Sequence, residues 1–319
     1  MEQVTPDITM EQNRTRTASS TLLKTVKRNW DLYVMIIPVI AFFIIFAYLP
    51  LYGIQIAFKD FSAFKGIWDS PWVGFKHFER FFDSYYFWRL IRNSFLLGIY
   101  SLAIGFPIPI ILALMLNEVK SNRFKKFVQT ITYAPYFLST VVIVGMLFIF
   151  LSPRTGLINH IIQAFGGDPI AFMTSSGWFK TLYVFSDVWQ TAGWSSIIYL
   201  ASLAGIDSQL HEAAKVDGAT KLQRIWHINI PGIMPTIIIL LILNLGSVLS
   251  IGFEKVLLMQ NNLNMSGSDI ISTYVYRSGI LDAQYSFSTA VDLFNSIINF
   301  ILLVTVNYVA RRVNDTSLW

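Results

Sequence analysis

Long apolar stretches alternate with polar segments along this chain. Six stretches can be distinguished, over residues 32–58, 92–117, 127–151, 181–205, 232–252 and 286–310. A helix needs about 20 apolar residues to cross the hydrocarbon core of a membrane. The pattern therefore predicts an all-α, polytopic membrane protein with six transmembrane helices.

Prolines and glycines interrupt several of these predicted spans. Pro38 and Pro50 are expected to kink the first span, and "GFPIPIILALML" places Pro107 and Pro109 in the second. Membrane helices tolerate proline because neighbouring groups satisfy the freed carbonyls. Gly246 and Gly252 weaken the expected end of the fifth span.

The polar segments divide into two alternating sets. Residues 1–31, 118–126, 206–231 and 311–319 form one set, which contains the densest basic cluster, "KSNRFKKF". Basic loops remain on the cytoplasmic side, so we place this set and both termini in the cytoplasm of a multi-pass protein. The expected organisation is a cytoplasmic N-terminal segment (1–31), a permease domain (32–310) that contains the 206–231 loop, and a cytoplasmic tail (311–319).

The first apolar stretch is expected to remain in the protein as a span. The polar residues before it end in Lys24, Lys27 and Arg28. The stretch is longer than the apolar region of a signal peptide, and no small-residue cleavage site follows it.

The other polar set, 59–91, 152–180 and 253–285, is expected outside. "SPWVGFKHFERFFDSYYFW" is rich in aromatic residues that either form an interfacial belt or dock a partner, and the sequence leaves both open. "NHIIQAFGGDP" predicts a short amphipathic helix that ends at Gly166-Gly167.

Composition supports a membrane protein. Hydrophobic residues make up 54% of the 319 positions and charged residues only 13%, whereas soluble domains carry roughly a quarter charged residues. The net charge of +5 is spread over the loops, so we expect contact with the lipid bilayer and no nucleic-acid partner. The chain has no cysteine, which excludes disulfides and Cys-ligated metals.

Catalytic and metal-binding motifs are missing. The chain has no G-x-x-x-x-G-K-[ST] phosphate loop and no G-x-S-x-G motif. His211-Glu212 begins like the zinc motif H-E-x-x-H, but Lys215 stands where the second histidine is needed. We therefore expect a non-catalytic protein with no metal site.

The loop at 206–231 predicts a helix–turn–helix that lies along the membrane surface. Asp207 or Ser208 can cap a helix that ends at Gly218 in the left-handed conformation. Thr220 can cap a second helix, "KLQRIWHINI", which is expected to stop before Pro231.

The spacing within this loop resembles the cytoplasmic coupling motif of ATP-binding-cassette importer permeases, E-A-A-x-x-x-G followed after nine residues by I-x-L-P. Glu212, Ala213, Ala214 and Gly218 match the first part, and Ile228 and Pro231 match the second. Ile230 replaces the leucine, and Asp217 occupies a variable position, which leaves its role less defined. The resemblance implies that this coupling-helix loop contacts an ATPase subunit.

Further phrases, such as "YAPYFLSTVVIVGMLF" and "WQTAGWSSIIYLASLAGID", are similar to the carbohydrate branch of these permeases, in particular oligosaccharide permeases of the LplB type. The resemblance implies import of a sugar or oligosaccharide across a bacterial plasma membrane. It also implies a second homologous permease (a heterodimer), two ATPase subunits that bind ATP and magnesium, and an extracytoplasmic solute-binding protein. No cofactor is expected in this chain.

Polar and aromatic residues inside the spans are candidates for the substrate pathway. Ionisable residues within a membrane span suggest function, and sugars are held by aromatic faces and hydrogen bonds. Asp187 is favoured as a substrate or gating residue, whereas Asp292 and Asn295 are favoured as polar contacts between helices. The candidate set is Tyr136, Tyr183, Asp187, Trp189, Gln190, Trp194 and Asn244, of which Tyr136 and Asn244 fit either role equally.

Two other classes of protein compete with the importer. An ion-driven secondary transporter or channel would show inverted repeats and broken half-helices, and neither is evident. A membrane-embedded enzyme would need clustered acid–base or metal residues, yet the chain has only four histidines. The sequence leaves the sugar open between uronic-acid oligomers and neutral glycans.

Overall fold

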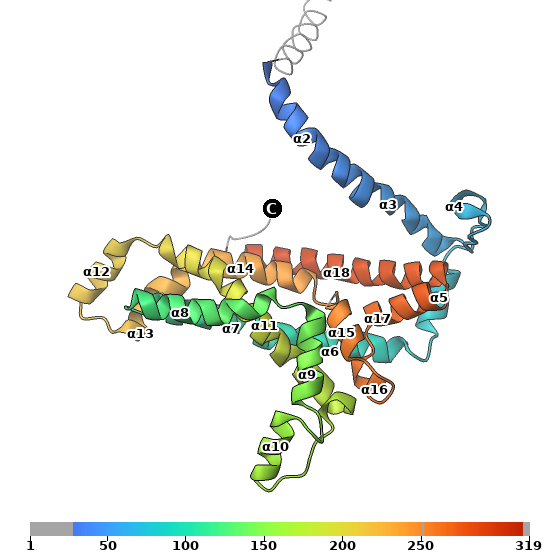
Figure 1. Ribbon diagram of the computed structural model, residues 1–319. Helices are drawn as coiled ribbons and strands as arrows, with labels where there is room; N and C mark the ends of the chain where they lie inside the picture. Colours follow the sequence, from blue (N-terminus) through green and yellow to red (C-terminus); the bar gives the residue numbers. More distant parts are fainter. Residues whose placement is uncertain (1–27, 251, 315–319) are drawn as a thin grey trace, which may run out of the picture.

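The computed structural model describes residues 28–250 and 252–314, and these form helices with no strand beyond two isolated bridges. This agrees with the all-α prediction. The expected cytoplasmic segment 1–31 lies mostly outside the described residues, as does most of the tail 311–319. Figure 1 shows a bundle of roughly parallel helices with one long helix standing apart.

The helix that stands apart is the first predicted span. It comprises α2 (Trp30–Phe43), a π-helical turn (Ile44–Tyr48), α3 (Leu49–Leu51) and a 3₁₀ helix (Tyr52–Phe58). The helix continues through Pro38 and Pro50, and the wide π turn lies directly before Pro50. No residue of α2 is buried; only the 3₁₀ end packs against the bundle, mainly on α18.

The second predicted span begins earlier than expected. It consists of α6 (Phe87–Gly105) and α7 (Pro107–Asn117), which meet at Phe106. Before it, the aromatic segment that was expected outside folds into α4 (Gly66–Asp69) and α5 (Lys76–Phe82). Phe81 of α5 is fully buried in a cluster with Leu90, Ile271, Phe287 and Val291, so part of this aromatic segment is core.

The third predicted span is broken. Helix α8 (Asn122–Tyr133) and a 3₁₀ turn (Ala134–Phe137) meet α9 (Thr140–Phe150) at an angle of 99°. Ser139 caps α9 by accepting a hydrogen bond from the Val142 amide, and Gln190 donates to the Leu138 carbonyl at 3.0 Å. A new N-cap and an anchored carbonyl thus end one helix and start the next within two residues.

Helix α11 (Ser176–Ala204) runs through the centre of the bundle and contains the fourth predicted span. It packs against α6, α7, α8, α14 and α16. Gly193 allows the close approach of α8, because an added Cβ would lie 2.0 Å from the Thr132 carbonyl oxygen. Ahead of α11, α10 (Leu157–Ala164) and Gly166, with a φ of +83°, confirm the predicted short helix and its end.

The loop after α11 forms α12 (Ser208–Val216) and α13 (Lys221–Arg224). The prediction that the second helix stops before Pro231 is wrong. The chain continues from α13 through a π turn (Ile225–Asn229) into α14 (Ile230–Gly246). In the π turn, the Ile230 amide donates a hydrogen bond to the Ile225 carbonyl. This wider turn lets the helix continue through Pro231, which has no amide hydrogen.

The fifth predicted span ends at Gly246, six residues earlier than expected. After it come α15 (Phe253–Met259), α16 (Met265–Ser268), α17 (Ile271–Tyr276) and a π turn (Arg277–Leu281). Helix α18 (Tyr285–Asn314) contains the sixth predicted span and lies along α14.

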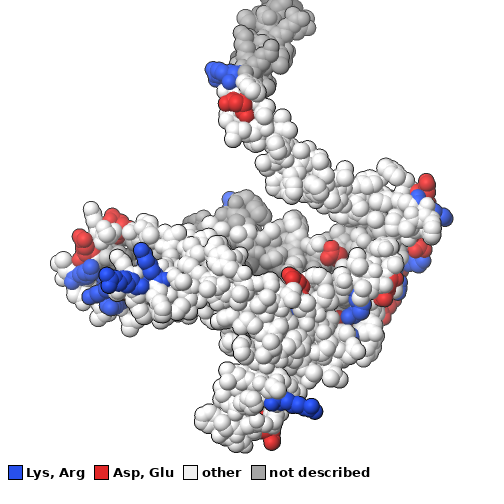
Figure 2. All heavy atoms as spheres, viewed as in Figure 1, with Lys and Arg blue, Asp and Glu red and all other residues white. Residues whose placement is uncertain are grey.

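Within the described residues, four helices are long and apolar enough to cross a membrane: Trp30–Phe58, Phe87–Asn117, Lys221–Gly246 and Tyr285–Arg312. The bent pair α8–α9 would make a fifth. Helix α11 has the length but carries more polar residues and is not among them. Figure 2 shows Lys, Arg, Asp and Glu gathered near α12–α13 and at the opposite end of the bundle, with few between them on this face.

Candidate functional site

The first candidate site is the elbow formed by α12 and α13. Asp207 caps α12, its Oδ1 accepting a hydrogen bond from the Gln209 amide at 2.9 Å. Gly218 ends the helix with a φ of +76°. Thr220 and Gln223 form a reciprocal capping box, with 2.7 Å between the Thr220 amide and Gln223 Oε1. All three local predictions are therefore confirmed.

The elbow surrounds a hollow of about 320 Å³, into which the two helices bring several predicted residues. Ala214, Asp217, Gly218 and Ile228 line it, together with Arg224 and others. Glu212 and Ala213 are exposed on α12, and Pro231 is exposed where α14 begins. The seven predicted coupling residues thus divide between the hollow and the outer surface of the elbow.

Large apolar side chains are exposed on this otherwise polar elbow. Val216 is 87% exposed, Leu222 68% and Trp226 65%. Exposed apolar side chains that cluster within a polar rim mark surfaces that bind a partner.

An ion pair links the elbow to the second span, and no sequence pattern indicated it. Arg224 of α13 lies 3.8 Å from Glu118, which directly follows α7, and both side chains are largely buried. These residues are 106 positions apart, so only the folded structure shows that the pair ties the elbow to α7.

The second candidate site is a polar cavity of about 200 Å³ inside the bundle. Asp187 of α11 and Asn244 of α14 both line it, so the structure brings these two predicted pathway residues together. Further polar lining comes from Ser101, Thr191, Ser195 and Ser247. The Ser101 hydroxyl is buried and has no hydrogen-bond partner among the described residues. An adjoining hollow of about 190 Å³ shares Ser195 and Asn244.

Lys255, the ion-pair partner of Asp187, was absent from the predicted set. Its Nζ donates to Asp187 Oδ1 at 3.3 Å and lies 5.1 Å from the centre of the Tyr183 ring. The Lys255 side chain is 4% exposed and that of Asp187 41%. Burial lowers the pKa of Lys255, and the neighbouring Asp187 carboxylate partly offsets this effect.

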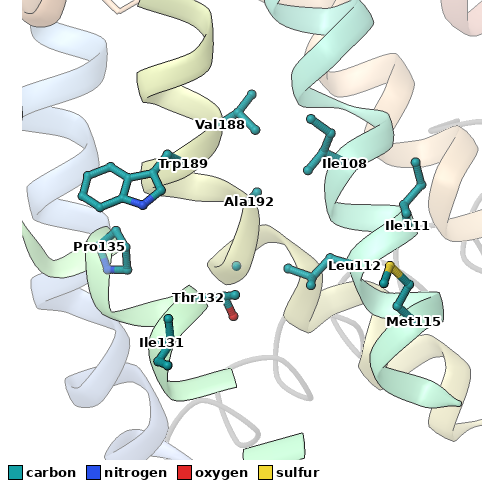
Figure 3. A pocket seen from close by; sticks show the side chains of 11 residues that line it. Ile108, Ile111, Leu112, Met115, Ile131, Thr132, Pro135, Val188, Trp189 and Ala192 are labelled. Carbon is teal, nitrogen blue, oxygen red and sulfur yellow. The ribbon is translucent and has the colours of Figure 1, made fainter. Parts of the chain in front are cut away.

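The other predicted pathway residues lie elsewhere on α11, except Tyr136, which lies in the 3₁₀ turn before α9. Tyr183 is buried. Trp194 stacks on Tyr136 with ring centres 4.6 Å apart, and Gln190 is bonded to the backbone at the bend. Trp189 lines an apolar hollow of about 470 Å³ between α7, α8 and α11, together with Ile108, Leu112 and Pro135 (Figure 3). The single sugar-binding set expected on this helix is thus divided among several environments.

The polar residues of α18 differ in their surroundings, and Asn299 bonds to the turn that follows α14. Asn299 Oδ1 accepts from the Leu249 amide at 3.2 Å, and its Nδ2 donates to Ser250 Oγ at 2.8 Å. Asn295 is buried, but its Oδ1 has no hydrogen-bond partner among the described residues, and Asp292 is exposed. The polar contacts between helices predicted for these two residues are therefore not seen in the part of the chain that the structure describes. No group of three His, Asp or Glu residues that could hold a metal occurs in 28–250 or 252–314.

Comparison with known proteins gives consistent matches. The model of the family described as "Binding-protein-dependent transport system inner membrane component" matches residues 105–315. Protein LplB of Bacillus subtilis (strain 168) is 45% identical over 294 residues, which are 92% of each chain. The polygalacturonan/rhamnogalacturonan transport system permease protein YteP of the same organism is 45% identical, over 93% of this chain and 92% of YteP.

Solved structures give the same picture. A chain of a bacterial ABC transporter involved in the import of the acidic polysaccharide alginate is 42% identical, with a TM-score of 0.86. The match covers 92% of this chain and 99% of that one. A second structure shows a bacterial alginate ABC transporter in complex with an alginate pentasaccharide-bound periplasmic protein, with the same score and identity over 93% of this chain.

Proposed function

The chain belongs to the family of binding-protein-dependent transport system inner membrane components, and we propose that it moves an oligosaccharide into the cytoplasm. It is the permease subunit of an ABC importer and hydrolyses no ATP itself, because that reaction belongs to a separate ATPase chain. ATP and magnesium accordingly bind to the ATPase.

The elbow carries this proposal. Glu212, Ala213, Ala214 and Gly218 stand on a capped, exposed helix, and large apolar side chains are exposed beside them. A cleft of the ATPase would cover these side chains. Closure of two ATPases would then move the elbow and, through the Arg224–Glu118 pair and the continuous α13–α14 helix, tilt the attached spans.

We propose six crossings, with both termini in the cytoplasm of a bacterium's plasma membrane. Helix α11 counts as one of these crossings, although its polar residues keep it out of the four apolar helices described above. With 29 residues it is about 43 Å long at 1.5 Å per residue, enough to span the hydrocarbon core. The bent pair α8–α9 counts as one further crossing and brings the total to six. The described parts of 1–31 and 311–319 then lie on the same side as the elbow.

The cargo is a sugar or oligosaccharide. YteP is named for polygalacturonan and rhamnogalacturonan, and the matched solved transporter imports alginate. In this chain, the cavity lined by Asp187, Asn244 and several hydroxyl groups offers the hydrogen bonds that a sugar needs. The substrate pathway would also include the predicted residues that lie outside this cavity: Tyr136, Tyr183, Trp189, Gln190 and Trp194.

Two further partners complete the proposed assembly. A second, homologous permease would pair with this one, since the first span has no packing partner along most of its length. A solute-binding protein would dock on the outer segments. The matched alginate transporter was solved in complex with a periplasmic protein.

Reconstitution with a candidate second permease, ATPase and binding protein tests the proposal. Glu212→Ala should sharply lower the ATPase activity stimulated by a loaded binding protein, without loss of the chain from the membrane. Gln209→Ala, on the same helix but outside the motif, should leave it unchanged. Uptake that proceeds without any ATPase subunit would overturn the proposal in favour of an ion-driven transporter.

A further inference from the structure

Asp187 lines the polar cavity, and its charge is balanced by Lys255, a lysine that a ligand in the cavity cannot reach. Lys255 lies on α15, just after the fifth span, and its charge is directed at Asp187 on α11. With only 4% of its side chain exposed, Lys255 offers no free donor to the cavity. Asp187 is 41% exposed and lines the cavity, so the carboxylate is the charged group that a ligand meets.

This pair orients the carboxylate of Asp187. A buried cation is costly unless it is paired, and Asp187 is the only carboxylate within ion-pair distance of Lys255 in the described chain. Asp187 is the carboxylate partner in this ion pair, and a carboxylate accepts hydrogen bonds. Oδ1 faces Lys255, and no hydrogen bond from the described residues reaches Oδ2.

The remaining lining matches the same ligand chemistry. Ser101 has an unpaired buried hydroxyl, which can donate or accept. Asn244 donates its Nδ2 to the Leu240 carbonyl at 2.7 Å, which leaves its Oδ1 to accept a hydrogen bond. Hydroxyl donors therefore find acceptors in this cavity, whereas a second carboxylate would face Asp187 and be repelled.

We propose that Asp187, held in place by Lys255, binds sugar hydroxyls in a subsite that takes an uncharged face of the saccharide. The assignment rests on the proposed function and adds the chemistry that this site recognises. In an acidic saccharide, the carboxylate groups would point away from Asp187. Lys255 is a positioning residue, and Asp187 touches the cargo. The cavity and its adjoining hollow together fall in the lower part of the range of about 300–1,000 Å³ for small-ligand sites, which suits one sugar unit at a time.

The test compares single and double substitutions in the reconstituted complex. Asp187→Asn leaves Lys255 buried and unpaired, and Lys255→Met leaves Asp187 unpaired, so each can also disturb folding. The double variant Asp187→Asn with Lys255→Met removes both charges and restores an uncharged, foldable pair. Thermal stability of the purified complex reports on folding. ATP hydrolysis driven by binding protein loaded with short gluco-oligosaccharides or short oligogalacturonates reports on transport.

We expect the double variant to regain thermal stability while its maximal saccharide-stimulated rate remains lower by about tenfold, the loss expected for one hydrogen bond to a charged group. The apparent affinity of the complex for the loaded binding protein should not change. Asp187→Glu should recover part of the rate. Asp292→Asn, which removes a carboxylate from α18, should behave like the wild type.

The opposite result is equally clear. If the double variant recovers both stability and rate, the pair is only structural and the subsite does not exist. A wild-type complex that responds to no loaded binding protein would instead contradict the proposed function itself.

Discussion

Gly218 shows how one backbone angle can control the elbow. Its φ is +76°, and no atom lies within 4 Å of the position of an added Cβ. Gly218→Ala should therefore cost only the backbone penalty of about 1–2 kcal/mol, confined to the turn. We expect normal assembly in the membrane but weaker ATPase stimulation, measured in the reconstituted complex.

Gly205 supplies the control for this variant. It lies shortly before α12 and has a φ of −83°. A Cβ added at Gly205 would lie 3.4 Å from the nearest atom, the Ser202 carbonyl oxygen. Gly205→Ala should leave stimulation unchanged. Equal losses in both variants would show that the left-handed turn is not the cause.

His77 makes the outer segment sensitive to acid. Burial lowers the pKa of His77 below 6.5, although its bond to the Lys59 carbonyl opposes this effect. The unfolded state therefore binds more protons than the folded state between 6.5 and the lower folded pKa. The contribution of neutral His77 to the folding stability is therefore fully present above pH 6.5. It is lost as the pH falls from 6.5 through the lower folded pKa.

Limited proteolysis of the outer segment between pH 7.5 and pH 5 checks this prediction. Cleavage should increase as the pH falls in the wild type, and much less in His77→Gln, which keeps a donor for the Lys59 carbonyl. An identical pH profile in both proteins would contradict it.

Residues that depend only on local sequence were predictable, and those that depend on distant partners were not. Asp207, Gly218 and Thr220 act within a few positions of themselves, so cap and turn preferences identify them. Lys255 and the Arg224–Glu118 pair depend on helices that meet only after folding. The same holds for Trp189, which the sequence grouped with Asp187 although it faces an apolar hollow.

At the scale of elements, α12 depends on its cap. It has nine residues, too few for stability in isolation, and is exposed to solvent. Asp207→Ala should destabilise it by about 1 kcal/mol, whereas Asp207→Asn keeps an accepting oxygen and should cost less. Hydrogen exchange of the α12 amides measures the difference, and equal protection in both variants would show that the cap does not hold the helix.

The helices that the sequence described least well are those that contacts reshape. The pattern of apolar stretches located α6–α7 and α18 to within five residues at each end and α14 to within six. It missed the bend between α8 and α9, because that bend depends on Gln190 and on a cap at Ser139 rather than on hydrophobicity. It ended a helix at Pro231, because a π turn before proline has no simple sequence signature.

At the scale of the whole molecule, one buried carboxylate ties α6 to the turn that follows α17. Asp269 is fully buried and lies 3.0 Å from both Arg89 of α6 and Arg277, which follows α17. Asp269→Asn leaves two arginines without a counter-charge and should cost about 3 kcal/mol, the lower part of the range for broken buried pairs. Thermal unfolding of the purified complex should shift down by several degrees.

The exposed pair of Asp60 and Lys76, 3.5 Å apart, provides the comparison. Both side chains are more than half exposed, and such pairs contribute between about 0 and 1 kcal/mol. Asp60→Asn should therefore leave the unfolding temperature almost unchanged. A similar shift in both variants would mean that burial is not what makes Asp269 important.

The first span gives the clearest indication that this chain is one subunit of a larger complex. In Figure 1, α2 and α3 run far from the other helices, and no residue of α2 is buried against them. A membrane helix that gains nothing from its own bundle packs on lipid or on another protein. The exposed surface of α2 leads us to expect the second permease there.

The absence of cysteine makes this expectation easy to test. A single cysteine at Ile37 or Phe46, which are 57% and 66% exposed, can carry a photoreactive maleimide in the assembled complex. Both positions should cross-link to the second permease, whereas Phe165 at the end of α10, 90% exposed, should not. Cross-links from α2 only to lipid or to its own bundle would show that the helix stands apart for another reason, and the pairing of two permeases would then need a different interface.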